Sequence, residues 1–314
     1  MNRRDFLLSS AAAALATRSL ACAATRSAPI PAIDTHTHFY DPTRGQGVPW
    51  PPKNDDVLFK PHLPGDFRGV TAHLNVVGTV VVEASEWVGD NDWIFNLAKT
   101  NPEIVGFVGH LVPSKPEFAE NLRRLAADPL FRGLRLRASY LANLTDPAVA
   151  ADLKRVADLD LAIDTVGNAS ILAPTLALSR QLPGLRIVID HVPFQQWDAN
   201  PAAMRPAFSE LALRPNVFAK ISNVVRRVDG KTIDDPAHYR PALDELFNLF
   251  GPDRIVYGSN WPVSNRAGSY PTVHRVVADY FATKDRTTAE KYFWRNSHVA
   301  YRWLRRGAAA SLTP

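Results

Sequence analysis

Two histidines near the start of the chain, His36 and His38, have the spacing of residues that share one face of a strand. They lie in the segment AIDTHTHFYD, residues 32–41, which begins with an apolar, extended pattern. Side chains two positions apart on a strand point the same way, so Asp34 is expected to join them. Imidazole is the commonest metal ligand and the usual proton carrier near neutral pH. The spacing predicts a metal site or an acid–base site, with an exposed turn as the alternative.

Polar and ionisable side chains also end most of the other apolar segments. Reading each segment to its end gives Glu83, His110, Arg135, Arg137, Asp164, Asp190, His191, Lys220 and Asn260. A buried polar group needs a partner or a function, and each of these residues taken alone can be structural. Their shared position at segment ends predicts a single active site.

The segments that must position these residues alternate between short apolar runs and longer amphipathic ones. The predicted strands are residues 32–34, 79–84, 104–108, 133–136, 159–163, 186–189, 217–221 and 254–257. Their continuous Val, Ile and Leu content is typical of parallel strands covered on both faces. Eight such strands predict a single-domain α/β fold, the (β/α)8 TIM barrel, with chemistry at the carboxyl ends of the strands. An open doubly wound sheet is less consistent, because no glycine-rich phosphate turn follows an early strand.

Three helix boundaries can be predicted from local sequence. Asp146 before Pro147 predicts a capped helix start, and Ser114 with Glu117 predicts a capping box. A helix is expected to end at Gly251-Pro252, since glycine commonly follows the last helical turn.

The N-terminus has the composition of an export signal. The chain has 314 residues, 46% of them hydrophobic, and a formal charge of +5. Residues 1–24 contain paired arginines, then a short apolar run interrupted by Arg18, then small residues. This pattern predicts a twin-arginine-type signal and no membrane span, so we expect a periplasmic or secreted protein.

The composition also limits the partners. Removing the signal lowers the charge to about +3, and no clustered basic stripe supports nucleic-acid binding. Cys22 is the only cysteine, so no internal disulfide can form; its lipidation stays an open alternative. A small-molecule substrate is expected, and a homo-oligomer is compatible with the sequence.

Four motifs carry a resemblance to a known family. They are residues 34–41 with VPW at 48–50, Asp190-His191, AKIS at 219–222, and RIVYGSNWPV at 254–263. In these motifs the chain resembles the amidohydrolase superfamily (amidohydrolase family 2), in its branch of sugar-lactone and 2-pyrone-4,6-dicarboxylate lactonases. The resemblance places an amidohydrolase-like barrel domain at residues 30–305. It implies hydrolysis of a small lactone, of a sugar acid or a dicarboxylate, by activated water.

The resemblance matches His36, His38 and His191 to histidines of the family's site and Asn260 to its eighth-strand position. With the strand-end residues Lys220 and Glu83, they form the predicted catalytic set. Two mechanisms are open. In one, the three histidines hold a divalent ion such as Zn²⁺, and Glu83 or Asp164 is the base. In the other no metal is bound, and the histidines and Lys220 stabilise the oxyanion. Asn260 stands where many relatives have aspartate, and an amide supplies neither a base nor a charged ligand.

The candidates for substrate binding are three arginines and two tryptophans: Arg135, Arg137, Arg226, Trp50 and Trp261. Guanidinium groups suit carboxylates, and indole rings suit sugar faces. Trp50 belongs to the loop 42–64, which is too long for a simple connection and is expected to cross the barrel mouth. Two other functions stay open: a metal-dependent decarboxylase of the same superfamily, and a non-catalytic binding barrel, which Asn260 would explain.

Overall fold

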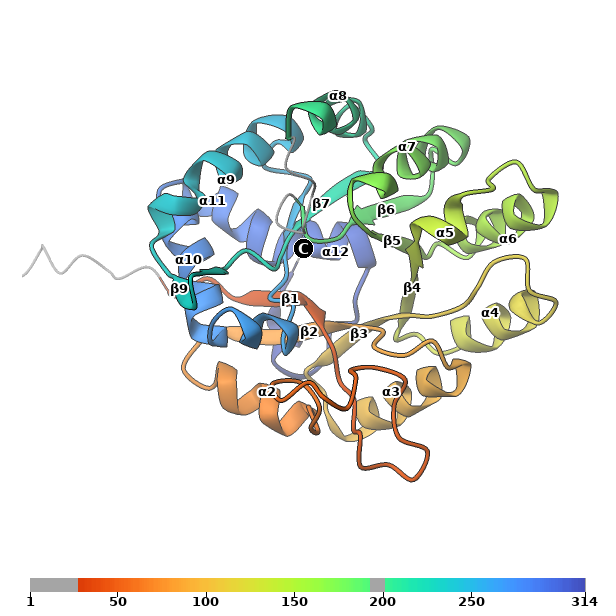
Figure 1. Cartoon of the computed structure of the whole chain (residues 1–314), viewed down its shortest axis with the longest axis horizontal. Helices are drawn as coiled ribbons and strands as arrows, with labels where there is room; N and C mark the ends of the chain where they lie inside the picture. The colour runs from red at the N-terminus through yellow and green to blue at the C-terminus, as the bar shows by residue number, and fades with distance from the viewer. Residues whose placement is uncertain (1–27, 193–200, 314) are drawn as a thin grey trace, which may run out of the picture.

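The strands form one eight-stranded parallel sheet, curved into the predicted barrel, with helices around it (Figure 1). The computed structural model describes residues 28–192 and 201–313, so the predicted export signal and Cys22 lie outside the described residues. The strands in sheet order are β1 (Ala32–Thr37), β2 (Val76–Val82), β3 (Ile104–Gly109), β4 (Phe131–Arg137), β5 (Ala162–Val166), β6 (Arg186–Ile189), β7 (Val217–Ile221) and β10 (Ile255–Tyr257).

The ring closes where the ends of β1 and β10 meet. Thr37 forms a parallel bridge with Trp261. The Asn260 N–H donates to the His36 carbonyl at 2.9 Å, and the His38 N–H donates to the Trp261 carbonyl at 2.8 Å. The closure therefore brings the first and last predicted motifs into direct backbone contact.

Helices surround the strands, most of them on the outside of the ring (Figure 1). They are α2 (Pro64–Thr71), α3 (Val88–Thr100), α4 (Phe118–Ala126), α5 (Ala138–Leu141), α6 (Pro147–Asp158), α7 (Leu172–Gln181), α8 (Pro201–Ala212), α9 (Pro236–Phe250), α10 (Tyr270–Phe281), α11 (Arg286–Glu290) and α12 (Asn296–Tyr301). A small antiparallel hairpin, β8 (Arg226–Val228) with β9 (Lys231–Ile233), follows β7. Within the described residues, no helix has the length and apolarity needed to cross a bilayer.

Two of the three predicted helix boundaries are confirmed. The Asp146 carboxylate accepts hydrogen bonds from the first backbone N–H groups of α6, and α9 ends at Gly251, whose φ is +68°. The predicted capping box is wrong: α4 begins at Phe118, and Glu117 makes no side-chain cap. The backbone N–H of Ser114 instead donates to the Asp152 carboxylate at 2.8 Å, so a tertiary contact replaces the local one.

One predicted strand begins too early in the sequence. Leu159 is the C-cap of α6 and 44% exposed, and Asp160 turns the chain with φ of +56° before β5 starts at Ala162. The hydrophobic pattern alone does not distinguish an exposed apolar residue next to a strand from the strand itself, because it does not reveal the turn between them.

The C-terminal segment closes the end of the barrel opposite the strand carboxyl ends. Trp303 and Tyr301 pack with inward-facing strand residues such as Ile33 and Val80 in one buried cluster. The backbone N–H of Leu304 donates to the Val105 carbonyl at 2.7 Å. With this end filled, the open end of the barrel is the one at which the polar strand ends gather.

Candidate active site

A cavity of about 620 Å³ opens at the carboxyl ends of the strands. Eight of the predicted site residues line it: His38, Trp50, Glu83, Arg135, Arg137, His191, Arg226 and Asn260. The loop 42–64 contributes Trp50, whose ring centroid lies 6.1 Å from that of His38. Part of this loop therefore forms a wall of the cavity mouth.

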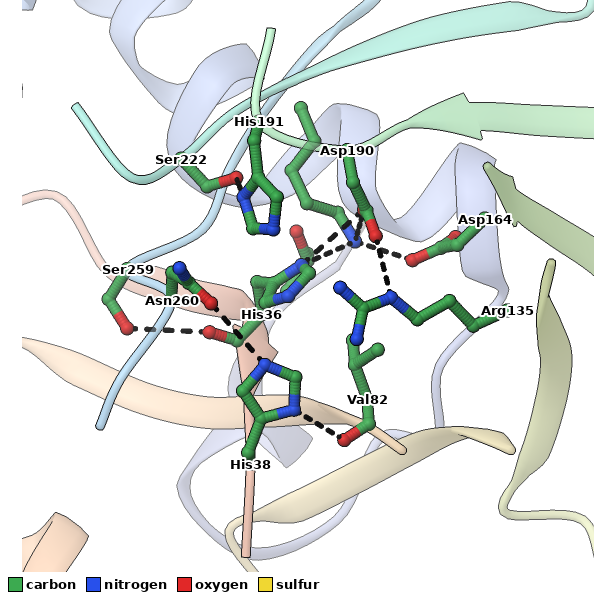
Figure 2. Close-up of polar contacts among 12 residues, drawn as sticks. His36, His38, Val82, Arg135, Asp164, Asp190, His191, Ser222, Ser259 and Asn260 are labelled. Carbon is green, nitrogen blue, oxygen red and sulfur yellow. Dashed lines mark hydrogen bonds and ion pairs between the residues drawn. The ribbon is translucent and has the colours of Figure 1, made fainter. Parts of the chain in front are cut away.

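Lys220 lies fully buried among two carboxyl groups and one imidazole that come from the strands β5 and β1 and from the end of β6. Its Nζ is 2.6 Å from Asp164 Oδ2, 2.9 Å from Asp190 Oδ1 and 3.3 Å from His36 Nδ1. Figure 2 shows His36, Asp164 and Asp190 converging on this point. An ammonium has three protons and no lone pair. Here Lys220 donates hydrogen bonds to Asp164 and His36, and its contact with Asp190 is an ion pair without hydrogen-bond alignment. Asp164 accepts a second hydrogen bond, from the hydroxyl group of Tyr301 on α12, with its Oδ1 at 2.8 Å.

Asp190 connects this group to the cavity wall. Its Oδ2 lies 3.2 Å from Arg135 Nε, while its Oδ1 faces Lys220. Burial alone raises the pKa of Asp190, but the adjacent Lys220 ammonium, with His36 and Arg135, holds that pKa well below its usual range. Asp190 is therefore an anion shared between two cations.

The three histidines lie together and are uncharged at neutral pH. The His36 ring centroid is 4.9 Å from that of His38 and 4.4 Å from that of His191. Burial lowers the pKa of His38 to about 4 and that of His191 to about 3, and it lowers the pKa of His36 well below 6.5. Each ring therefore carries one N–H and one lone pair, and the partners of each nitrogen decide which is which.

Those partners assign different roles to the rings. His38 Nδ1 lies 2.9 Å from the Val82 carbonyl, which only accepts, so Nδ1 carries the proton and Nε2 has the lone pair. His191 Nδ1 lies 2.8 Å from Ser222 Oγ, and the buried hydroxyl has no other acceptor among the described residues. Ser222 therefore donates to Nδ1, and His191 carries its proton on Nε2, at the cavity.

Backbone conformation directs these side chains. Asp190 and His191 are consecutive, so on a regular strand they would face opposite ways. His191 has φ of +62°, a left-handed conformation that is rare for histidine, and this turn lets both side chains reach the site. Asn260, at the end of β10, also has φ of +62°. Its Oδ1 is 3.3 Å from His38 Nε2, and a half-turn of the amide presents its NH₂ group to that lone pair.

Glu83, Arg135 and Arg137 also line the cavity. Burial raises the pKa of Glu83, which is 7% exposed, to about 7. Its nearest cation is Arg135, whose Nη1 lies 3.7 Å from Oε1. Arg135 is thus held between Glu83 and Asp190. Arg137 is exposed in the cavity and forms no ion pair with any residue in the described ranges.

Comparison with known proteins identifies the family. A sequence model described as amidohydrolase matches residues 33–303. The chain belongs to the amidohydrolase family. It is 31% identical to an L-fucono-1,5-lactonase of Burkholderia ambifaria, over 76% of this chain and 82% of that protein. It is 27% identical to an L-fucono-1,5-lactonase of Burkholderia multivorans, over 83% of this chain and 92% of that one.

A solved structure supports the fold of this amidohydrolase. A crystal structure of an amidohydrolase from Burkholderia multivorans with bound zinc superposes with a TM-score of 0.76 at 23% identity, covering 87% of this chain and 99% of that one. At this identity the likeness establishes the shared barrel. Together with the named relatives, it establishes that the amidohydrolase is a hydrolase of the lactonase-like branch, as the sequence motifs predict.

Three predicted residues of the amidohydrolase do not line the cavity: His36, which is fully buried behind it, Lys220 and Trp261. Trp261 is 1% exposed and packs against Phe39 and Phe67 in the core between β1 and α2. Lys220 is placed beneath His36 and does not line the cavity, so it acts through its neighbours.

Asp34 does not point with His36 and His38, contrary to the strand alternation. Its carboxylate accepts from the Ser259 N–H at 2.9 Å and from the Tyr270 hydroxyl, on α10, at 2.9 Å. The pairing of β1 with β2 shifts register between Asp34 and Thr37, and such an irregularity interrupts the alternation of faces. Asp34 therefore connects the ends of β1 and β10 and does not take part in the cavity.

The roles of three further residues, Asp190, Ser222 and Tyr301, could not be predicted in full from the sequence. Asp190 is visible as a strand end, but its pairing with Lys220 and Arg135 depends on barrel closure. Ser222 is two positions after Lys220, so strand alternation places it on the same side. Tyr301 comes from the C-terminal helix, and no local pattern relates it to Asp164.

A divalent ion held by three imidazoles requires a lone pair from each ring. His38 has its lone pair on Nε2, beside Asn260. The lone pairs of His36 and His191 are on Nδ1, and they accept from Lys220 and Ser222. Only one of the three rings thus offers a metal-binding nitrogen at the cavity.

The surrounding charges also disfavour a divalent ion. Ligand atoms of His36, Asp190 and His191 lie within 4.8 Å of one another, which is close enough to share an ion. However, Asp190 already neutralises Lys220 and Arg135, and Asn260 adds no charge. As arranged here, the donor set of the amidohydrolase does not fit a divalent metal.

Proposed function

We propose that this amidohydrolase opens the ring of a sugar-acid lactone by direct attack of water on the carbonyl carbon. The observation that carries the proposal is the shared cavity: a buried carboxyl with a pKa of about 7 faces it together with neutral imidazoles and arginines. A base with a pKa near the working pH is the group that activates water most effectively. The named lactonase relatives support this reaction class.

Glu83 is the general base in this proposal. The water oxygen bonds to the carbonyl carbon while Glu83 takes one water proton, and the His38 Nε2 lone pair orients the water. The carbonyl oxygen becomes an oxyanion, which accepts hydrogen bonds from His191 Nε2–H and Arg135. Collapse of this intermediate breaks the ring C–O bond, and Glu83 returns its proton to the departing alkoxide. The product is a hydroxy acid.

The rest of the cavity fits a polar substrate of sugar size. A volume of about 620 Å³ lies within the range of small-molecule sites. Arg137 and Arg226 present guanidinium groups there, and Trp50 presents an aromatic face. These groups suit a ring that bears hydroxyls or a carboxylate.

A lactone panel tests the reaction. Purified enzyme is mixed with 1,4- and 1,5-lactones of sugar acids, some bearing a second carboxylate, and acid release is followed with a pH indicator. We expect turnover of at least one lactone, at a rate that a chelator leaves unchanged, and none with His38→Ala. A wild-type protein that binds lactones but hydrolyses none of them would identify a non-catalytic barrel.

We also propose that the enzyme acts outside the cytoplasm. The support is the pair Arg3-Arg4 ahead of a short apolar run. Cell fractionation tests this: the protein is expected in the periplasm or medium, and Arg3→Lys with Arg4→Lys is expected to retain it in the cytoplasm. Equal distribution of the two proteins would contradict export by this route.

A further inference from the structure

We propose that the Lys220 ammonium is the resident cation of this site, and that removing its side chain creates a divalent-metal site from Asp164, Asp190 and His36. This inference is independent of the substrate and of the proposed reaction. It concerns which cation occupies the shell formed by Asp164, Asp190 and His36.

The three partners of Nζ form a ligand shell. They come from β5, from the residue after β6 and from β1, and their atoms lie 2.6, 2.9 and 3.3 Å from Nζ. All the side chains involved are completely buried. Two carboxylate oxygens and one imidazole nitrogen are also a usual donor set for Zn²⁺ or Mn²⁺. The shell differs from a metal site in that an ammonium occupies it.

Lys220 sets the protonation of His36. An ammonium can only donate, so the nitrogen that faces it, Nδ1, must be the acceptor. His36 Nδ1 lies at nearly the same distance, 3.4 Å, from Asp190 Oδ1, but that contact lacks the alignment of a hydrogen bond, because Asp190 Oδ1 accepts none from the described residues. The proton of His36 therefore resides on Nε2, which has no partner within the described fold.

Charge explains why the Lys220 ammonium and a divalent metal ion cannot occupy this shell together. Asp190 is an anion between Lys220 and Arg135. Burial raises the pKa of Asp164 to about 7, but Lys220 and Tyr301 both donate hydrogen bonds to this carboxyl group and favour its charged form beside the ammonium. A divalent ion added to the same shell would stand within about 3 Å of an ammonium in a dry environment, where like charges repel strongly. Without the lysine, the two carboxylates would balance one divalent ion, and His36 Nδ1 would be free to bind it.

Metal titration of purified variants tests the proposal. Wild type, Lys220→Ala, Lys220→Arg and the surface control Lys99→Ala are prepared metal-free, titrated with Zn²⁺ or Mn²⁺ by calorimetry, and analysed for metal content. We expect Lys220→Ala to bind one ion more per chain than wild type and to gain thermal stability when the ion is added. Adding Asp164→Asn to Lys220→Ala should weaken that binding at least about tenfold, because it removes a charged ligand.

Lys220→Arg and Lys99→Ala should match the wild type, since one keeps a donor-only cation in place and the other lies on the surface of α3. A folded Lys220→Ala that binds no extra ion overturns the proposal. So does an extra ion in Lys220→Arg. If Lys220→Ala folds only when metal is supplied, metal-dependent refolding is the supporting result, and equal failure with and without metal is the contrary one.

The wild-type protein provides a test that needs no variant to fold. Nitrogen-15 NMR of labelled histidines distinguishes a protonated ring nitrogen from a bare one. We expect His36 to carry its proton on Nε2, with a bare Nδ1, while His38 shows the opposite arrangement. A proton on His36 Nδ1 would show that Asp190, and not Lys220, sets this ring, and would overturn the resident-cation proposal.

Discussion

Replacing Glu83 by Gln should make the enzyme inactive and, above neutral pH, more stable. Gln has nearly the same shape as Glu but can neither ionise nor accept a proton from water. Burial raises the pKa of Glu83 from its ordinary value of 4.5 to about 7. The folded protein therefore keeps a proton on Glu83 at pH values where the unfolded chain has released it.

The sign and size of the stability effect follow from this difference. Where the folded state binds more protons, the free energy of unfolding falls as the pH rises, so wild type loses stability between about pH 4.5 and pH 7. At about 1.4 kcal/mol for each pKa unit, the loss above pH 7 is about 3 kcal/mol. Glu83→Gln removes this loss, so its melting temperature should be higher than that of wild type by roughly 5 °C at pH 8 and by little at pH 5.

Thermal unfolding at pH 5 and pH 8 measures the effect, with Glu86→Gln as the control, because Glu86 is an exposed carboxylate at the same cavity. In parallel, wild-type kcat/KM is expected to rise with pH through about 7, and kcat of Glu83→Gln to fall by about 10²–10⁴. A stability difference that is equal at both pH values would refute the assigned pKa. Undiminished activity in Glu83→Gln would refute its role as base.

The remaining predictions concern other groups of the site. His36→Ala and His38→Ala should each lower kcat/KM by about 10²–10⁴ while circular dichroism stays native, and unaltered rates in both would exclude this site. Asn260→Asp should raise the affinity for a divalent ion by about tenfold or more, since it places a carboxylate beside His38 Nε2; equal metal content in the two proteins would contradict this. Arg137→Met should raise KM about tenfold with kcat nearly constant, measured on the best lactone of the panel, because it removes a charged donor from the cavity.

The barrel could be predicted from sequence because each of its strands is a continuous apolar run with a polar end. That pattern arises directly from burial on both faces, so all eight strands lie within a few residues of their predicted positions. The convergence of His38, Glu83, His191 and Asn260 on one cavity follows from the same reasoning, since parallel strands place their ends together.

What could not be predicted depends on contacts between distant segments. Asp34 leaves the face of His36 because strand pairing shifts register, and no residue type records such a shift. Trp261 packs in the core against Phe39 and Phe67, whereas its position next to Asn260 in the sequence suggested that it would line the cavity. The tautomers of the histidines depend on partners from other strands, which the spacing of His36 and His38 does not reveal.

The contact of Tyr301 with Asp164 makes the last part of the chain a component of the catalytic centre. A growing polypeptide can form the first seven strands and still lack the hydroxyl that completes this carboxylate. The site is therefore complete only after α12 has been synthesised. A chain cut before Tyr301 would carry every cavity residue but would leave the Asp164 carboxyl group, and with it Lys220, without this hydrogen bond.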